Sequence, residues 1–287
     1  MIVSASRRTD VPALYSGWLR RRLAEGYARV PHPFRPSRVR TVDLRPRPEG
    51  TLDLLVLWTR DPGPVLPDVA AWEARGIRTL WLVTLTGYPG ALEPGAPDLQ
   101  RVVRTLEDLS RRVGRERIAW RYDPVIEVPE LGMDAAWHAE NFARLARRLA
   151  PLVGRCIASF YDPYAAPERR LKRAGLSARP PEDRTGIAFV LAAVAREHGL
   201  VLQSCCDDME AGGVPAGACI DGRLIDRLWG LGVGDARDPG QRPRCRCAPS
   251  VDIGVYNTCT HGCLYCYAVR CARTAPARQD PARESLG

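Results

Sequence analysis

Three cysteines near the end of the chain have the spacing of an iron–sulfur ligand set. Cys259, Cys263 and Cys266 form a C-x3-C-x2-C pattern, and Tyr265 directly precedes the last cysteine. Cysteine thiolates hold iron–sulfur clusters, and a cubane cluster has one ligand position on each iron. Three thiolates would therefore ligate three irons of a 4Fe-4S cluster and leave the fourth iron open. An open iron accepts a substrate or cofactor, so the pattern predicts reactive chemistry rather than electron storage alone.

A zinc ion is the alternative occupant of this motif. Zn²⁺ binds Cys and His ligands with tetrahedral geometry, and His261 lies inside the motif. Structural zinc sites, however, usually take their ligands from two spaced pairs, whereas this motif is a single triplet. The ligand pattern favours the iron–sulfur interpretation and leaves zinc open.

A second set of cysteines lies before the triplet. Cys205, Cys219, Cys245 and Cys247 supply four thiolates, and Cys206 is an adjacent extra thiol. Four thiolates complete the ligand set of a cubane cluster, and the same four suit one tetrahedral zinc ion. The C-x-C pair at 245 and 247 is too closely spaced for ordinary core packing to explain. We predict a second metal site, with a second 4Fe-4S cluster and zinc both open.

Seven short apolar runs predict β-strands, and amphipathic segments separate them. Three of these segments repeat apolar residues at three and four and predict helices over residues 98–113, 134–149 and 183–198, with Asp134 as an N-cap. Alternating strands and helices predict a parallel α/β sheet, and seven strands favour a complete or partial TIM-like β/α barrel. The predicted strands are residues 2–6, 52–58, 79–85, 117–120, 156–160, 200–204 and 251–256.

Polar side chains follow the carboxyl ends of several predicted strands. In parallel β/α proteins these positions face a common active site, so we expect these side chains to line one cavity at the carboxyl ends of the strands. Buried arginines are costly unless paired, and guanidinium groups bind carboxylates and phosphates. An Asp-Pro pair is also a typical helix start, which leaves a purely structural role open for the three such aspartates, Asp61, Asp123 and Asp162.

The cysteine triplet with its tyrosine resembles the signature of radical S-adenosylmethionine (SAM) enzymes. Five further segments resemble a bacterial family of unknown function, domain of unknown function 1848, which is described as carrying a radical-SAM-like cysteine cluster at its C-terminus. The matches keep the family's order and run from about residue 1 to residue 268. They are SASRRTDVP at 4–12, WTRDP at 58–62, WRYDP at 120–124, CIDG at 219–222 and DIGVYNTC at 252–259.

The resemblance implies a cofactor and a reaction class. In radical SAM enzymes the open iron chelates SAM through its amino and carboxylate groups, and the reduced cluster cleaves SAM to a 5′-deoxyadenosyl radical. Such an enzyme needs a cytoplasmic reductant of the flavodoxin or ferredoxin type, and its substrate here is unidentified. We expect cofactor binding by Arg121, Tyr122, Thr84, Thr86 and Tyr265, and substrate contact or catalysis by Arg7, Arg8, Asp10 and Asp123.

The position of the triplet departs from the radical SAM pattern. Radical SAM barrels normally place these cysteines after the first strand, whereas here they follow the last predicted strand, residues 251–256. We therefore expect a circularly permuted barrel in which this last strand pairs with residues 2–6. Permutation is tolerated where the termini lie close together at the surface.

Length and composition predict one domain. The chain has 287 residues, near the upper size for a single core. We expect one β/α domain over residues 1–271 and a mobile tail over residues 272–287. The sequence contains no apolar run of about 20 residues and no signal-peptide pattern, so we expect a cytoplasmic protein without a membrane partner. Cytosolic cysteines are read as metal ligands or buried thiols; Cys156 fits a buried thiol, and Cys271 is given no role.

Two other functions stay open. The net charge is +9, carried by 41 arginines and one lysine, and residues 263–268 (CLYCYA) are similar to spore photoproduct lyases, which repair DNA. A basic DNA-repair enzyme is therefore one alternative, although no basic block interleaved with aromatic residues is present. The other alternative is a non-enzymatic protein that uses its cysteines for electron transfer or structural zinc.

Overall fold

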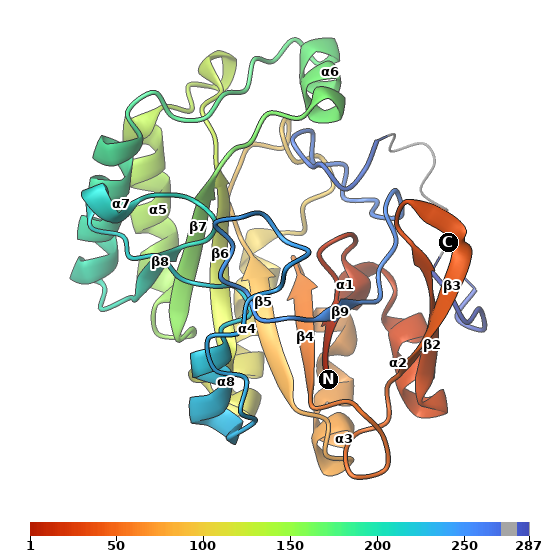
Figure 1. Cartoon of the computed structure of the whole chain (residues 1–287). Helices are drawn as coiled ribbons and strands as arrows, with labels where there is room; N and C mark the ends of the chain where they lie inside the picture. Colours follow the sequence, from red (N-terminus) through yellow and green to blue (C-terminus); the bar gives the residue numbers. More distant parts are fainter. Residues whose placement is uncertain (271–279, 287) are drawn as a thin grey trace.

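A seven-stranded parallel sheet forms the centre of the molecule (Figure 1). The structure is a computed structural model that describes residues 1–270 and 280–286. The strands lie in the order β8-β7-β6-β5-β4-β1-β9. All seven predicted strands are present, as β1 (Ile2–Ala5), β4 (Leu54–Thr59), β5 (Thr79–Thr84), β6 (Ile118–Val125), β7 (Arg155–Phe160), β8 (Leu202–Ser204) and β9 (Val251–Asp252).

The three predicted helices are also present, and each begins at a capping aspartate. Asp98, Asp134 and Asp183 each accept a hydrogen bond from a backbone N–H in the first turn of the helix that follows. No helix in the described residues is long and apolar enough to cross a membrane. The helices are α1 (Val11–Leu14), α2 (Ser16–Glu25), α3 (Val69–Ala74), α4 (Leu99–Val113), α5 (Ala135–Leu149), α6 (Ala165–Arg173), α7 (Arg184–Glu197) and α8 (Gly222–Trp229).

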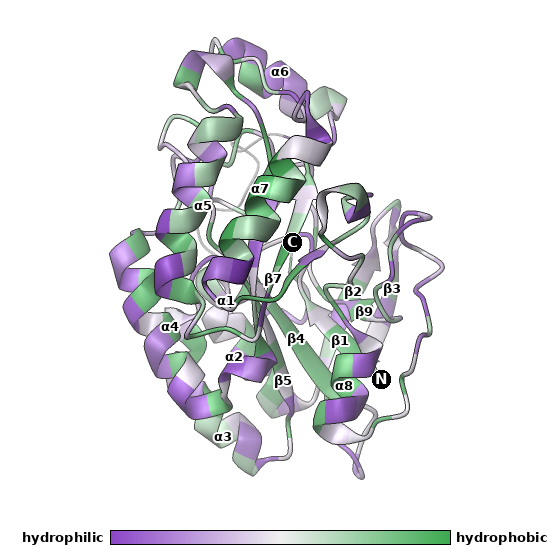
Figure 2. Ribbon diagram, turned by 90° about the vertical axis from the view of Figure 1, so that its left-hand side faces the viewer, coloured by the Kyte–Doolittle hydropathy of each residue, from purple (hydrophilic) through white to green (hydrophobic). Residues whose placement is uncertain are grey.

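The two faces of the sheet are covered differently. On β4, Leu55 and Leu57 pack into the large core shared with helices α2, α4, α5 and α7. Leu54 and Val56 point the other way and pack into a smaller core with α8 and the second cysteine set. This alternation follows from the two-residue period of a strand. Figure 2 shows strands that are largely hydrophobic and helices, such as α4, that carry both hydrophobic and hydrophilic residues.

The sheet is open rather than closed. In the described residues β8 and β9 form its two edges, so the complete form of the predicted TIM-like barrel is not observed. The fold is a mixed α/β fold with a seven-stranded parallel sheet and flanking helices. The predicted pairing of the last strand with the first is present, because Val3 pairs with Val251 and Ser4 with Asp252. Strand β9 is shorter than predicted because the Gly254 N–H turns back to the Asp252 side chain.

One hairpin has no counterpart among the predicted strands. Strands β2 (Tyr27–His32) and β3 (Arg35–Asp43) pair antiparallel, and most of β3 is exposed. Residues 280–286 lie near this part of the molecule, where Arg29 N–H donates to the Glu284 carbonyl at 2.9 Å and Leu286 is buried. The rest of the predicted mobile tail, and Cys271, lie outside the described residues.

His138 on α5 is a buried neutral base. Its Nδ1 lies 2.7 Å from the Tyr122 hydroxyl and its Nε2 lies 2.9 Å from the Ile126 carbonyl, so one neutral tautomer satisfies both contacts. Burial lowers the pKa of His138 from 6.5 to about 4. Between these two values the unfolded chain binds the proton and the folded chain does not, so stability falls as the pH falls through this window.

We predict that the free energy of unfolding drops by about 2 kcal/mol between pH 7.5 and pH 5 through His138 alone. Thermal melting of the protein and of His138→Gln at both pH values measures this contribution. The variant should be less stable at pH 7.5 and show a smaller loss on acidification. His198→Gln, at a partly exposed histidine, is the control and should follow the parent. An equal acid loss in His138→Gln and the parent would contradict the assignment.

Candidate functional site

One cavity gathers most of the predicted chemistry at the carboxyl ends of the strands. Its volume is about 580 Å³, within the range of small-molecule sites. All seven predicted cysteine ligands line it, together with Cys206. The other predicted residues that line it are Arg7, Arg8, Asp10, Thr84, Arg121, Asp123 and Tyr265.

A second hollow, of about 370 Å³, lies at the opposite edge of the sheet. Loops that precede strands line it, around Arg115, Pro151 and Gly199. None of its described lining residues is a cysteine, and none belongs to a predicted motif. The chemistry of the chain is therefore concentrated at the carboxyl edge, as parallel β/α architecture predicts.

The loop that carries the cysteine triplet is pressed against the loop after β5. Gly95 N–H donates to the His261 carbonyl at 2.9 Å, and Leu264 N–H donates to the Leu92 carbonyl at 3.0 Å. A Cβ at Gly95 would lie 2.5 Å from the His261 carbonyl oxygen, so only glycine permits this approach. Gly262 has φ +71°, which lets the chain turn between the first two cysteines.

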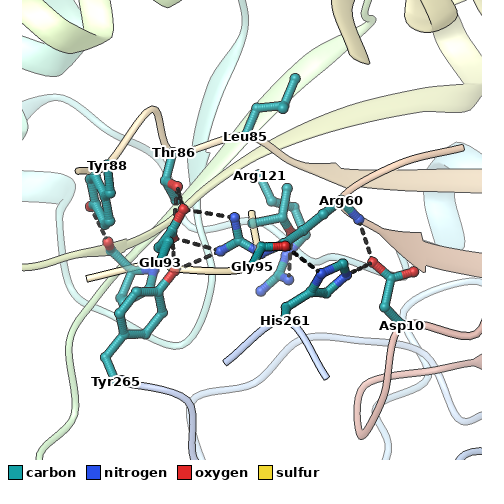
Figure 3. Close-up of polar contacts among 12 residues, drawn as sticks. Asp10, Arg60, Leu85, Thr86, Tyr88, Glu93, Gly95, Arg121, His261 and Tyr265 are labelled. Atoms are coloured by element: carbon teal, nitrogen blue, oxygen red, sulfur yellow. Dashed lines mark hydrogen bonds and ion pairs between the residues drawn. The ribbon is translucent and has the colours of Figure 1, made fainter. Parts of the chain in front are cut away.

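A buried ion pair fixes the tyrosine of the motif (Figure 3). Arg60 donates through both terminal nitrogens to Glu93, at 2.9 and 2.7 Å, and through Nη2 to the Tyr265 hydroxyl at 2.7 Å. Glu93 also accepts from Tyr265 and, at 2.8 Å, from the Thr86 hydroxyl. The Glu93 side chain is only 2% exposed and that of Arg60 11%. This network holds Tyr265 in place beside the cysteines.

A second carboxylate anchors the first half of the motif. His261 Nε2 lies 2.8 Å from Asp10 Oδ2, and its Nδ1 lies 3.0 Å from the Gly95 carbonyl. Both partners are acceptors, and a protonated ring, which donates from both nitrogens, suits this arrangement. Burial acts to lower the pKa of His261, but the hydrogen bond and charge of Asp10 raise it above its usual value. Asp10 also caps α1 through Ala13 N–H at 3.0 Å and is therefore an anchor of this region.

The triplet cysteines are partly buried. Burial raises the pKa of Cys259 and of Cys263 to about 12 each. Thiols of this kind lose their protons when a metal takes their place, because metal binding and deprotonation are coupled. The residues thus fit a metal cofactor that would supply the missing positive charge.

The spacing of the sulfurs separates the two cysteine sets. In the described residues, the groups of thiols whose sulfurs lie within 4.8 Å of one another all belong to the second set. A tetrahedral zinc places its sulfurs about 3.8 Å apart, from the Zn–S bond length. A cubane cluster instead places each cysteine on a different iron. The wider triplet therefore fits a cluster better than a single ion.

The second set is a compact group of five thiols. The Sγ atom of Cys205 lies 3.4 Å from Cys219 Sγ and 3.9 Å from Cys206 Sγ. The groups Cys205–Cys219–Cys247 and Cys205–Cys206–Cys245 each lie within 4.8 Å, so these cysteines could hold a metal ion. Cys206 has φ +68°, a conformation that costs a non-glycine residue about 1 kcal/mol. Hydrogen bonds from neighbouring thiols lower the pKa of Cys247.

Two predicted cofactor-binding residues lie outside the cavity. Tyr122 is fully buried on the helix-covered face, where its hydroxyl accepts from Asn141 Nδ2 at 3.1 Å and contacts His138. Arg121 and Asp123 flank it in β6 and point into the cavity instead. Neighbours in a strand face opposite ways, so Arg121 and Tyr122 do not share a site. Thr86 is also buried and donates to Glu93 rather than lining the cavity.

The three Asp-Pro aspartates differ in their surroundings. Asp61 accepts from Gly63 N–H at 2.9 Å and from Arg101 at 2.7 Å, which fits a structural turn. Asp123 lies within β6 and accepts from Arg121 and Ser159, so it caps no helix. Asp162 pairs with Arg242 at the cavity. Of the three, only Asp61 bonds to the start of a helix: it accepts from Gly63, the first residue of the 3₁₀ helix Gly63–Asp68, whose N-cap is Pro62.

Two residues of the site were missed by the sequence reasoning. Glu93 lies in an irregular loop, and no spacing connects it with Arg60 or Tyr265. Cys206 was given only as an adjacent extra thiol and not as a ligand. Its left-handed backbone brings it into the group and could not be read from the sequence.

Comparison with known proteins gives one match. The model of a family described as Domain of unknown function (DUF1848) matches residues 2–268. No curated protein and no solved structure matches the chain. The match spans nearly the whole chain and confirms the predicted family, and its description states no activity.

We predict that Glu93→Gln lowers the free energy of unfolding by about 3 kcal/mol, because it leaves the buried Arg60 without its carboxylate. Thermal or denaturant unfolding measures the loss. Glu107→Gln, at an exposed position on α4, is the matched control and should change little. Equal stability of the two variants would show that the Arg60–Glu93 pair does not hold this loop.

Proposed function

The chain belongs to the DUF1848 family, and from that premise and its cysteine chemistry we propose that it is a radical SAM enzyme. Cys259, Cys263 and Cys266 would hold a 4Fe-4S cluster and leave one iron for SAM. When bound, this group supplies the electron that cleaves SAM to a 5′-deoxyadenosyl radical. The observation that carries the proposal is that three partly buried thiols, spaced too widely for one ion, line a cavity of ligand size.

The chain's own residues would position these groups and exclude water. The Arg60–Glu93 pair and the Asp10–His261 pair fix the cysteine loop from two sides. Arg170 on α6 donates to the Leu264 carbonyl at 3.2 Å and so holds the loop from a third element. A rigid cysteine loop keeps the open iron at a constant place in the cavity, as radical chemistry requires of its protein. Of the predicted cofactor-binding residues, Thr84, Arg121 and Tyr265 line the cavity.

The fold is consistent with a partial, circularly permuted radical SAM barrel. Counted from β9, the strands follow one another in space as β9, β1, β4, β5, β6, β7 and β8. In that order the cysteine triplet follows the first strand, which is its usual place in radical SAM enzymes. The electron donor would be a cytoplasmic protein of the flavodoxin or ferredoxin type, and the protein itself would be cytoplasmic.

The second cysteine group is proposed as a separate metal site. The Sγ atoms of Cys205 and Cys219 are 3.4 Å apart, close to the spacing around one tetrahedral ion. This compactness favours zinc, and a second 4Fe-4S cluster is the alternative. A protein in which both sites hold zinc would be structural rather than catalytic. Metal analysis after anaerobic purification separates the structural protein from the enzyme. The enzyme must contain iron and sulfide at the triplet, whereas the structural protein contains zinc alone.

The central test is the electron paramagnetic resonance (EPR) spectrum of the anaerobically reconstituted protein. We predict a reduced-cubane signal that changes on adding SAM, and formation of 5′-deoxyadenosine with dithionite. Cys263→Ala should lose both. Cys156→Ala is the control, because Cys156 lies in β7 on the helix-covered face and should keep both.

Two outcomes decide against the proposal. Fully loaded protein that shows neither the spectral change nor 5′-deoxyadenosine would point to electron transfer alone. Zinc without iron or sulfide would point to a structural protein. Salt-dependent preference for damaged over undamaged duplex DNA would not contradict the proposal but would narrow it to a repair enzyme of the photoproduct-lyase kind.

A further inference from the structure

Arg7 and Arg121 both pack against Trp58 in the cavity, beside the second cysteine group. The guanidinium carbon of Arg7 lies 5.0 Å from the ring centroid of Trp58, and that of Arg121 lies 4.9 Å from it. The three residues come from the ends of β1, β4 and β6, and all line the cavity. Arg121 Nη1 also donates to Thr84 at 3.3 Å, which fixes its position.

These three side chains hold buried donors without acceptors. Arg7 Nη2, Arg121 Nε and Trp58 Nε1 are buried, and none has a hydrogen-bond partner in the described part of the chain. Trp58 is 7% exposed. Buried polar groups are nearly always hydrogen-bonded, because an unpaired one costs about 1–3 kcal/mol. Three such donors around one ring indicate a missing acceptor, and no oxygen or nitrogen of the described residues takes that place.

The carboxylates of the cavity are already engaged. Asp252 accepts from the hydroxyls of Ser4 and Ser6 and from two backbone N–H groups. Asp123 accepts from Ser159 as well as from Arg121. Within residues 1–270 and 280–286, Arg7 forms no ion pair with a carboxylate. Its Nη1 donates to the Ser250 hydroxyl at 3.0 Å, and Cys247 lies beside its side chain. The guanidinium group of Arg7 is therefore available to bind an anionic ligand.

An oxyanion has the chemistry to fill this place. Guanidinium groups bind carboxylates and phosphates through parallel N–H donors, and an indole N–H adds a third donor. The cavity is also lined by rings that are largely exposed, Phe34 at 81%, Tyr164 at 45% and Tyr267 at 51%. Exposed aromatic rings near Arg7 and Arg121 suit an organic molecule that carries an anionic group.

We propose that Arg7, Arg121 and Trp58 form an oxyanion subsite that holds the carboxylate or phosphate group of the substrate. This rests on the proposed function, since the substrate is that of the radical enzyme. It also assigns Arg121 to the substrate rather than to SAM, because Arg121 shares the tryptophan with Arg7 and lies near Cys219 of the second group. Arg7 is a neighbour of Cys247 and Cys219, so the thiolates of that group are the competing acceptor.

The test uses the anaerobic, metal-loaded full chain. Inorganic phosphate and acetate are titrated separately at constant ionic strength, and the melting temperature is recorded. Ligand binding to the folded state raises the melting temperature in a saturable way. We expect saturation in the millimolar range with at least one of the two anions, which also shows whether phosphate or carboxylate is preferred. Arg7→Gln and Arg121→Gln should each weaken the apparent affinity at least tenfold.

Two variants keep the test independent of misfolding. Trp58→Phe keeps an aromatic ring in the core and removes the N–H donor, and its own melting temperature without anion is its baseline because the smaller ring costs some stability. It should weaken the anion severalfold. Arg104→Gln, at an exposed position on α4 outside the cavity, should leave the anion effect unchanged. Equal anion affinity in the parent, Trp58→Phe and Arg7→Gln would overturn the subsite.

The SAM-dependent EPR change, measured on the same samples, separates the two proposals. Retention of that change in Arg7→Gln, with loss of the anion effect, supports a substrate subsite. Loss of both in Arg7→Gln would make the anion the carboxylate of SAM and overturn the proposal. Loss of metal from the second cysteine group in Arg7→Gln, without any saturable anion effect in the parent, would assign Arg7 to the thiolates and also overturn it. A saturable anion effect without any SAM response in the parent would contradict the radical SAM function alone.

Discussion

The junction between the first and last strands is the constraint on which the site depends. Asp252 on β9 accepts two hydroxyl hydrogen bonds from Ser4 and Ser6 at the end of β1, and a backbone hydrogen bond from Arg7. This one carboxylate brings the cysteine loop, which comes late in the chain, to the carboxyl edge of a sheet built mostly from the first 160 residues. Gly254 approaches so closely that a Cβ there would lie 2.0 Å from the Ser6 hydroxyl oxygen.

Charge explains why this edge of the sheet is suited to a metal cofactor. Buried carboxylates at Asp10 and Glu93 are each matched by a cation, at His261 and Arg60, so they stabilise the loop without needing a ligand. The thiols differ, because burial outweighs any neighbouring cation and keeps the pKa of Cys259 and Cys263 high. The loop is therefore rigid before a metal binds, while its ligands are incomplete until a metal supplies positive charge.

Much of this arrangement could be predicted from the sequence. Short apolar runs located all seven strands of the sheet, and the spacing of the cysteines located both thiol groups. Period-two alternation within β6 also separates Arg121 from Tyr122. Glu93 and the β2–β3 hairpin were beyond reach, because a loop acid has no periodic pattern and β3 is too exposed and too rich in arginine to show one. Their positions are set by tertiary contacts alone.

The most direct test of the account is a crystal structure of the anaerobically loaded protein, with diffraction measured on both sides of the iron absorption edge. The account predicts four irons in the cavity, three of them bound by Cys259, Cys263 and Cys266, with no protein atom on the fourth. A fourth protein ligand on that iron, or one tetrahedral ion held by the triplet, would contradict it.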